Sequence, residues 1–152
     1  MKERFEQFTV LINKISRAIK RIKNQEMADY GLKSVHVSCL YYLYTSRGLT
    51  ATELCERCEE DKATISRGLD YLEKNGFLTC PTKTQKRYKS PLILTPLGEE
   101  VGGRISDKIE RVLCEVSVGL DDAERAEFYR CLAIISENLD SIARQSNQTN
   151  VE

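Results

Sequence analysis

The chain has 152 residues, of which 23 are basic and 23 acidic, and 41% are hydrophobic. This length is typical of one domain with a substantial core, so we treat residues 1–152 as a single domain. No apolar run reaches the 18 residues that a membrane-spanning helix needs. The opening MKERFEQF lacks the apolar stretch of a signal peptide, and we therefore expect a cytoplasmic protein without a membrane partner.

The neutral total hides an uneven distribution of charge. Residues 1–98 contain 17 Lys and Arg against 11 Asp and Glu, whereas residues 99–152 contain 6 against 12. The first two thirds of the chain are therefore basic and the remainder acidic, which favours an anionic partner for the first part.

The first part of the chain predicts two helices. Apolar residues recur at spacings of three and four, which is typical of an amphipathic helix that ends before Gly31. These residues are Phe5, Phe8, Ile12, Ile15, Ile19 and Ile22. Ser34 is a candidate N-cap for a second helix, which carries Val37, Leu40, Tyr41 and Tyr44.

Residues 49–98 predict two short helices and a hairpin. Thr50 and Glu53 form a capping box that starts a helix at Ala51. Asp61 caps the next helix, which runs to about Asn75 and turns Ile65, Leu69 and Leu72 inward. Residues 77–82 and 91–94 read as the two strands of a small hairpin with a basic tip.

Two long helices are predicted at the end of the chain. Thr95 followed by Pro96 starts one of them, and Asp121 with Glu124 starts the other after Gly119. Their apolar stripes, together with that of the first helix, exceed what a small core covers. We therefore predict a homodimer in which residues 1–30 and 96–145 form the dimerisation helices.

The order of elements in residues 34–95 is typical of a winged helix-turn-helix. In that arrangement one helix enters the DNA major groove and a basic hairpin meets the flanking backbone. The helix after Asp61 carries four polar residues on the side away from its apolar face, Lys62, Thr64, Ser66 and Arg67. An arginine there can bind guanine, and Ser and Thr hydroxyls can reach bases or phosphates. A solvated helix face is the alternative, and the basic wing favours DNA. The fold class is thus mainly α, with a winged helix-turn-helix, a small β-hairpin wing and long terminal dimerisation helices.

These elements resemble the MarR (multiple antibiotic resistance regulator) family of winged-helix transcription factors over nearly the whole chain. The residues that carry the resemblance are Leu54, the ATISR segment at residues 63–67, Leu72, Glu73, Gly76, Phe77, and the wing exit Leu94-Thr95-x-x-Gly98. The resemblance implies a homodimeric repressor of a pseudo-palindromic operator in double-stranded DNA. The expected DNA contacts are Thr50, Thr52, Lys62, Thr64, Ser66, Arg67, Lys74, Lys83, Lys86, Arg87, Tyr88 and Lys89.

The wing departs from the family pattern. Members usually carry an Asp that positions an Arg at the tip, but those positions hold Lys86 and Tyr88 here, and Arg87 lies between them. Cys80 replaces another basic residue in the first wing strand. The tip nevertheless keeps four positive charges and no acid, so we expect contact with phosphates.

The resemblance also implies a small effector that releases the protein from DNA. Family members often bind aromatic or phenolic effectors in a cleft between the dimerisation helices and the winged region. The candidate residues are Tyr30, His36, Tyr41 and Tyr44, with core packing as the alternative reading of the tyrosines.

The cysteines suggest two further readings. His36-x-x-Cys39 and Cys55-x-x-Cys58 have a spacing compatible with zinc, although both pairs lie on predicted helices. Some family members sense peroxide through a cysteine in the first helix, which has none here. Cys39 and Cys80 are the redox candidates, with inert buried thiols as the favoured reading. Without a secretory signal, a disulfide scaffold is not expected, and we expect no bound metal.

Enzyme signatures such as a P-loop, H-E-x-x-H or G-x-S-x-G are missing from the sequence. We therefore expect a protein that is not an enzyme and needs no cofactor. A helical protein–protein adaptor without DNA binding is the alternative from another class, although an adaptor has no need of a basic, acid-free wing. A redox- or metal-responsive DNA-binding regulator is the other alternative.

Overall fold

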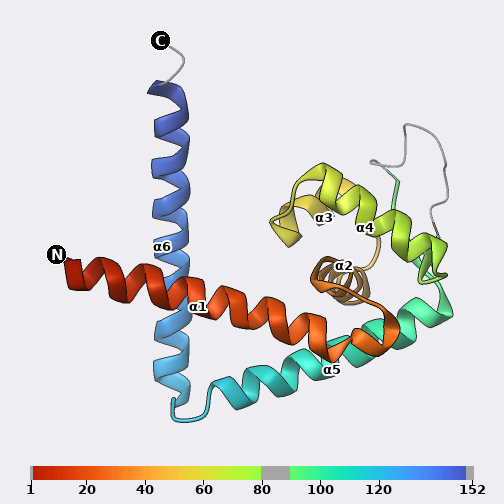
Figure 1. Cartoon of the computed structure of the whole chain (residues 1–152), viewed down its shortest axis with the longest axis horizontal. Helices are drawn as coiled ribbons and strands as arrows, with labels where there is room; N and C mark the ends of the chain where they lie inside the picture. The colour runs from red at the N-terminus through yellow and green to blue at the C-terminus, as the bar shows by residue number, and fades with distance from the viewer. Residues whose placement is uncertain (1, 80–89, 150–152) are drawn as a thin grey trace. The chain divides into compact units, whose positions relative to one another are not determined.

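The computed structural model describes residues 2–79 and 90–149, and within them it contains six α-helices and a two-stranded antiparallel hairpin (Figure 1). The elements are α1 (Lys2–Glu26), the short 3-10 helix η1 (Ala28–Tyr30), α2 (Ser34–Thr45), α3 (Ala51–Cys58), α4 (Lys62–Lys74), β1 (Leu78–Thr79), β2 (Ile93–Leu94), α5 (Pro96–Val116) and α6 (Asp122–Thr149). The prediction of a mainly α fold with a winged helix-turn-helix is confirmed.

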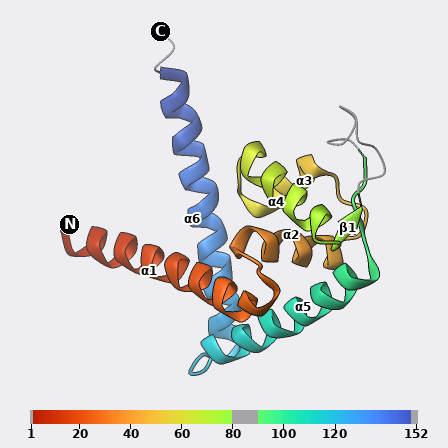
Figure 2. The same cartoon turned by 45° about the vertical axis from the view of Figure 1, so that its right-hand side comes forward.

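The chain divides into two compact units, Met1–Ile109 and Glu110–Glu152. Helix α2 lies at the centre of the first unit, with α3 and α4 on one side and α1 and the first part of α5 around the other (Figures 1 and 2). The second unit contains the end of α5 and α6. The winged region is therefore built around one buried helix.

The core of the first unit is apolar and continuous. Leu40 of α2, Leu54 of α3, and Ile65 and Leu72 of α4 are each 0% exposed. Val101 and Ile105 of α5 are buried in the same cluster. Apolar burial of this kind contributes about 25 cal/mol per Å² and is the main force that holds the helices together.

The predicted helix starts at Thr50, Asp61 and Thr95 are confirmed. Thr50 Oγ1 accepts a hydrogen bond from the Glu53 N–H at 3.3 Å, and the Glu53 carboxylate accepts one from the Thr50 N–H at 2.7 Å. Thr95 Oγ1 accepts the Gly98 N–H at 3.1 Å and thereby caps α5. These side chains satisfy N–H groups that have no partner within the helix.

The prediction that Ser34 caps the second helix is wrong. Lys33 is the N-cap, and Ser34 is the first helical residue, with its N–H donated to Asn24 Oδ1 at 2.7 Å. His36 Nδ1 accepts the Lys33 N–H at 3.0 Å, in the way that a Glu does in a capping box. The buried His36, at the third helical position, thus accepts the hydrogen bond of the N-cap residue. The general preference for Ser at the N-cap did not predict this arrangement.

The described hairpin is shorter than predicted. Leu78 pairs with Leu94 and Thr79 with Ile93, whereas the expected strands covered residues 77–82 and 91–94. Pro91 has no N–H for a strand ladder, and the Leu92 N–H is donated to Leu49 O at 2.9 Å instead. The residues of the first expected strand from Cys80 onward lie outside the described residues. The hairpin base is therefore tied to the segment that precedes α3.

A pair of glycines allows α5 to approach α2 closely. A Cβ on Gly102 would lie 2.8 Å from Tyr44 Cβ, whereas a Cβ on Gly103 would lie 3.4 Å from Tyr44 Oη. The first distance is shorter than any ordinary contact, so this crossing depends on the missing side chain at Gly102.

The apolar stripes of the terminal helices stay exposed in the single chain. On α1, Ile15 and Ile19 are 48% and 47% exposed, and on α6, Leu139 and Ile142 are 51% and 59% exposed. None of the helices in the described ranges is both long and apolar enough to cross a membrane. These stripes are consistent with the predicted dimer, which a single chain does not test.

Candidate nucleic-acid interface

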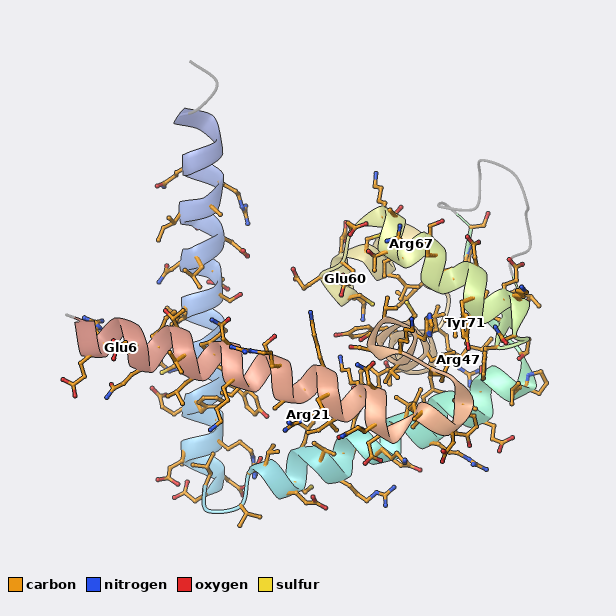
Figure 3. All side chains as sticks on the ribbon, in the orientation of Figure 1. Glu6, Arg21, Arg47, Glu60, Arg67 and Tyr71 are labelled. Carbon is orange, nitrogen blue, oxygen red and sulfur yellow. The ribbon has the colours of Figure 1, made fainter. Side chains whose placement is uncertain are left out.

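Helix α4 presents a polar face and a buried face. Lys62 and Arg67 are exposed, whereas Ile65, Leu69 and Leu72 point into the core. Figure 3 shows Arg67 on the side of α4 that faces away from α2. The predicted orientation of the outward face is confirmed for these side chains, and α4 can therefore present a guanidinium group to a groove.

Arg67 is held by a short chain of hydrogen bonds along the first turns of α4. Its guanidinium donates to Thr64 Oγ1 at 3.3 Å, and the Thr64 hydroxyl donates to Asp61 Oδ2 at 2.8 Å. Asp61 Oδ1 also accepts the Thr64 N–H at 2.8 Å, which is the helix cap. Spacings of three residues bring these side chains together on one face.

These hydrogen bonds keep the Asp61 side chain at the start of α4 negatively charged. The Thr64 N–H and hydroxyl, in that order, hold the pKa of Asp61 below its ordinary range. Asp61 therefore remains a carboxylate, and it partly balances the positive charge of Arg67 while keeping the Thr64 hydroxyl oriented. Thr64 is thus engaged within the helix rather than free to contact bases, a detail that its residue type alone did not reveal.

The back of α4 is fixed against α2 by two aromatic rings. The His36 and Tyr71 rings stack in parallel, with centroids 4.3 Å apart and an interplanar angle of 2°. Tyr71 Oη donates to Gly31 O at 2.9 Å, and Figure 3 shows Tyr71 on the inner side of α4. Gly68 leaves room for Val35 and His36. These contacts fix the rotation of α4 and hence the direction of Arg67.

The other residues of α3 and α4 that were expected to contact DNA differ in their exposure. Thr50 is half-buried and occupied in the cap of α3, while Thr52 lies exposed on the first turn of that helix. Ser66 is half-buried on α4, and Lys74 is exposed in its last turn. Arg57, which the sequence analysis did not single out, is exposed near the end of α3 and donates to Ser46 Oγ at 2.9 Å.

The expected wing contacts Lys83, Lys86, Arg87, Tyr88 and Lys89 lie outside the described residues, as does Cys80. The base of the hairpin is described, and it follows α4 directly. The Phe77 N–H is donated to Leu72 O at 2.9 Å, and the Thr95 N–H to Phe77 O at 3.1 Å. The wing therefore starts from the C-terminal end of α4, where a winged helix needs it.

Comparison with known proteins shows similarity to one family. A MarR family model matches residues 30–87. An uncharacterized HTH-type transcriptional regulator, YwoH of Bacillus subtilis, is 27% identical over 117 residues, which cover 77% of this chain and 85% of that protein. The chain is therefore similar to the MarR family over residues 30–87.

Solved structures agree with this assignment. The MarR family regulator NMB1585 of Neisseria meningitidis superimposes with a TM-score of 0.79 over 94% of this chain and 98% of that one, at 19% identity, which shows the shared fold. A putative MarR family regulator of Listeria monocytogenes, complexed with 26mer DNA, has a TM-score of 0.75 and 25% identity over 84% of this chain and 85% of that one.

The residues expected to bind an effector take part in packing contacts within the chain. Tyr44 packs on Gly102, His36 is 6% exposed in its stack with Tyr71, and Tyr41 contacts Tyr42 edge to face. Tyr30 accepts a hydrogen bond from Arg104. The effector assignment of Tyr30, His36, Tyr41 and Tyr44 remains a prediction, and packing within the chain accounts for most of their contacts.

A pocket of about 540 Å³ lies elsewhere in the first unit, where α1 meets the start of α2. Its lining includes the polar residues Lys20, Asn24, Lys33, Ser34 and Glu60 together with the apolar Ala28, Leu32 and Val35. None of the four expected effector residues lines it. The sequence signal for this pocket was weak, because lysines on a helix surface are usually only solvated.

The zinc reading of the cysteine and histidine pairs gains no support. No group of three or more His, Cys, Asp or Glu residues with the geometry of a metal site occurs among residues 2–79 and 90–149. His36 Nδ1 is occupied by the Lys33 N–H. Burial, and then the charge of Lys33, lower the pKa of His36 below its ordinary 6.5, so the ring is neutral at neutral pH.

Proposed function

We propose that this protein is a member of the MarR family and a sequence-specific DNA-binding repressor that reads its operator through α4. The observation that carries the proposal is the exposed Arg67, oriented by Thr64 and Asp61 on the face of α4 opposite the core. A preorganised guanidinium suits bidentate contact with guanine in the major groove. The relative from Listeria monocytogenes that is complexed with DNA supports the same use of this fold.

The protein binds this operator as a homodimer. The exposed apolar stripes of α1 and α6 support this part of the proposal, because stripes of this size on a single chain usually mark an interface. Two copies of α4 about 34 Å apart match successive major grooves, which calls for a pseudo-palindromic site. The basic tip, with Lys83, Lys86, Arg87 and Lys89, adds contacts to the phosphates.

A small effector releases the repressor by binding better to a dimer whose two recognition helices no longer match the groove spacing. The pocket of about 540 Å³ between α1 and α2 supports the presence of a ligand site in each chain.

The test begins with selection of a preferred duplex from random DNA, followed by measurement of affinity. Arg67→Ala should weaken binding to the selected site by about 1–3 kcal/mol and relax base preference at one position in each half-site. Arg130→Ala on α6 is the matched control, because Arg130 is also an exposed arginine that bonds a neighbouring residue, Glu127. If the parent and Arg67→Ala bind the selected site equally well, α4 does not recognise the bases through Arg67. Failure to select any duplex would favour the adaptor alternative.

A further inference from the structure

The segment that joins α1 to α2 has a fixed backbone. We call residues 27–33 the connector; it contains η1 and then Gly31, whose φ of 67° is left-handed. Met27 and Leu32 are buried in the core, with exposed fractions of 2% and 3%. The Leu32 N–H is donated to Met27 O at 3.2 Å, and the Gly31 N–H to Ala28 O at 2.8 Å. Burial and these hydrogen bonds therefore hold the Gly31 carbonyl in one place.

Helix α5 contacts the connector on one side. Lys108 Nζ donates to Glu26 O at 2.9 Å, at the point where α1 ends and the connector begins. The same ammonium group forms an ion pair with the Glu26 carboxylate at 2.7 Å. One turn earlier on α5, Arg104 donates to Tyr30 Oη. The connector is thus fixed by a helix that is not part of the helix-turn-helix.

Tyr71 of α4 contacts the connector on another side. Its hydroxyl donates to Gly31 O at 2.9 Å, which restrains the end of the side chain. Its ring stacks on His36 with centroids 4.3 Å apart, which restrains the plane of the ring. A Cβ on Gly31 would lie 2.9 Å from Tyr71 Oη, so the approach of the hydroxyl depends on the missing side chain at Gly31.

Tyr71 lies one helical turn after Arg67, and Figure 3 shows both side chains on α4. A rotation of α4 that moves Tyr71 away from Gly31 therefore also moves Arg67. A side chain that recognises a partner through directed hydrogen bonds has to be placed within about 0.5 Å and 10–20°. Attraction between a positive charge and phosphates tolerates larger displacements, because it carries no sequence information. The rotation of α4 thus matters for base recognition far more than for general affinity.

We propose that Tyr71 is a positioning residue for base recognition. Through its hydrogen bond to Gly31 O it sets the rotation of α4 relative to the connector, and it thereby aims Arg67 at the edge of a base. This proposal rests on the proposed function, in which Arg67 reads the operator. Loss of the Tyr71 hydroxyl removes no charge, so it should relax base preference without weakening the attraction to phosphates.

The first experiment measures the affinity of full-length Tyr71→Phe for the selected duplex and for random duplex. Phenylalanine keeps the ring that stacks on His36 and removes only the hydroxyl. We expect binding to the selected duplex to weaken about fivefold, typical of one hydrogen bond, with no change for random duplex. Tyr42→Phe is the matched control, because Tyr42 is also a half-buried tyrosine of the first unit but packs on Tyr41.

A purely structural role of Tyr71 gives a different result. Tyr71→Phe would then unfold at a lower denaturant concentration, but the folded variant would keep the ratio of its affinities for the two duplexes. An unchanged ratio, or an equal loss for both duplexes, would overturn the proposal. Both affinities are measured under conditions in which the unfolding curve shows each variant to be folded.

The second experiment approaches the same hydrogen bond from the connector. In Gly31→Ala the new methyl group displaces the Tyr71 hydroxyl, so the ratio of affinities should fall as it does in Tyr71→Phe. Adding Gly31→Ala to Tyr71→Phe should cause no further fall, because the displaced atom is then missing. Additive losses would overturn the proposal.

Gly48→Ala is the matched control for backbone strain. Gly48 also has a left-handed φ, of 80°, but a Cβ there meets no atom within 4 Å. Gly48→Ala should therefore lower stability and leave the ratio of affinities unchanged. A fall in the ratio as large as that of Gly31→Ala would assign the effect to strain and overturn the proposal.

Amide hydrogen exchange of the free protein separates this proposal from the proposed function. Tyr71→Phe should speed exchange in α4 more than in α3, because only α4 loses a contact with the connector. Unchanged exchange in α4 would overturn the positioning role. If the parent selects no duplex, the proposed function fails, while the exchange rates still decide whether Tyr71 fixes α4 to the connector.

Discussion

Amphipathic helices occur in the middle of the chain and at its two ends, but the apolar faces are buried in the middle and exposed at the ends. The buried apolar side chains of the described residues all lie between Met27 and Ile105. The large exposed ones gather mainly on α1 and from Leu113 to Ile142. Periodicity therefore identifies an apolar face in both regions but does not say what covers it. Within one chain only the middle region covers its own face.

The strongest test of this contrast compares Leu54→Ala with Leu139→Glu. Leu54 is 0% exposed, so its truncation should lower the free energy of unfolding by about 2–5 kcal/mol without changing the oligomeric state. Leu139 lies on the exposed stripe of α6, and a charge there should instead break the dimer, because glutamate is a good helix former but does not fit an apolar interface. Thermal unfolding and light scattering measure the two effects.

Light scattering of the parent should give twice the chain mass of 17.4 kDa. Ser141→Glu is the matched control for Leu139→Glu, because Ser141 is exposed on the opposite side of α6 and bonds only a carbonyl of its own helix, Glu137 O. A monomeric parent at micromolar concentration, or a Leu139→Glu protein that stays dimeric, would show that the stripe of α6 is not the interface.

A second test concerns the adjacent glycines of α5. Alanine stabilises a helix by about 1 kcal/mol relative to glycine. In Gly102→Ala the new methyl group overlaps Tyr44, and overpacking of this kind costs about 1–3 kcal/mol, so we expect net destabilisation. In Gly103→Ala the new methyl group meets only the far end of the Tyr44 ring, so we expect no loss or a small gain. Equal stability changes in chemical denaturation would contradict the close approach of α2 and α5.

A third test separates the positioning of Arg67 from its charge. Thr64→Val keeps the shape of the side chain and every charge but removes the hydroxyl that joins Asp61 to Arg67. We expect a loss of about 1 kcal/mol in operator affinity, typical of one hydrogen bond, and no change with random duplex. The loss should vanish when Arg67 is already alanine. Additive losses in this double-mutant cycle would mean that Thr64 contacts DNA itself.

The smallest expected effect is a dependence of folding stability on pH, which originates from His36 in the middle of the chain. Burial lowers the pKa of His36 below the ordinary 6.5, so below that pH the unfolded chain takes up a proton that the folded chain resists. Stability contributed by neutral His36 is therefore complete above pH 6.5 and is lost as the pH falls through the lower folded-state pKa. Unfolding titrations between pH 8 and pH 5 should show a smaller decline for His36→Gln than for the parent. Parallel curves would assign the decline to other groups.

Local rules predicted the elements of the winged region well. The caps at Thr50, Asp61 and Thr95 and the exit at Gly76 lie where the sequence placed them, because each depends on hydrogen bonds or backbone angles within a few residues. The same locality explains the outward position of Arg67. Helix periodicity also predicted the inward faces of α3 and α4, since Leu54 and Ile65 are both buried.

Other features depended on contacts between residues distant in the sequence. His36 looked like an effector ligand or a metal ligand, yet it caps α2 and stacks on Tyr71, 35 positions away. Spacing rules describe one helix at a time and carry no information about which helices become neighbours.

The sequence by itself therefore determined where α3, α4 and α5 begin, which side of each is apolar and that Arg67 of α4 faces outward, because these properties arise from interactions within a few residues. Only the tertiary structure decided that Tyr71 stacks on His36 and fixes α4 against α2, and that Gly102 admits Tyr44. These contacts are set by the mutual packing of helices around one core, where shape and volume select neighbours that no local pattern specifies.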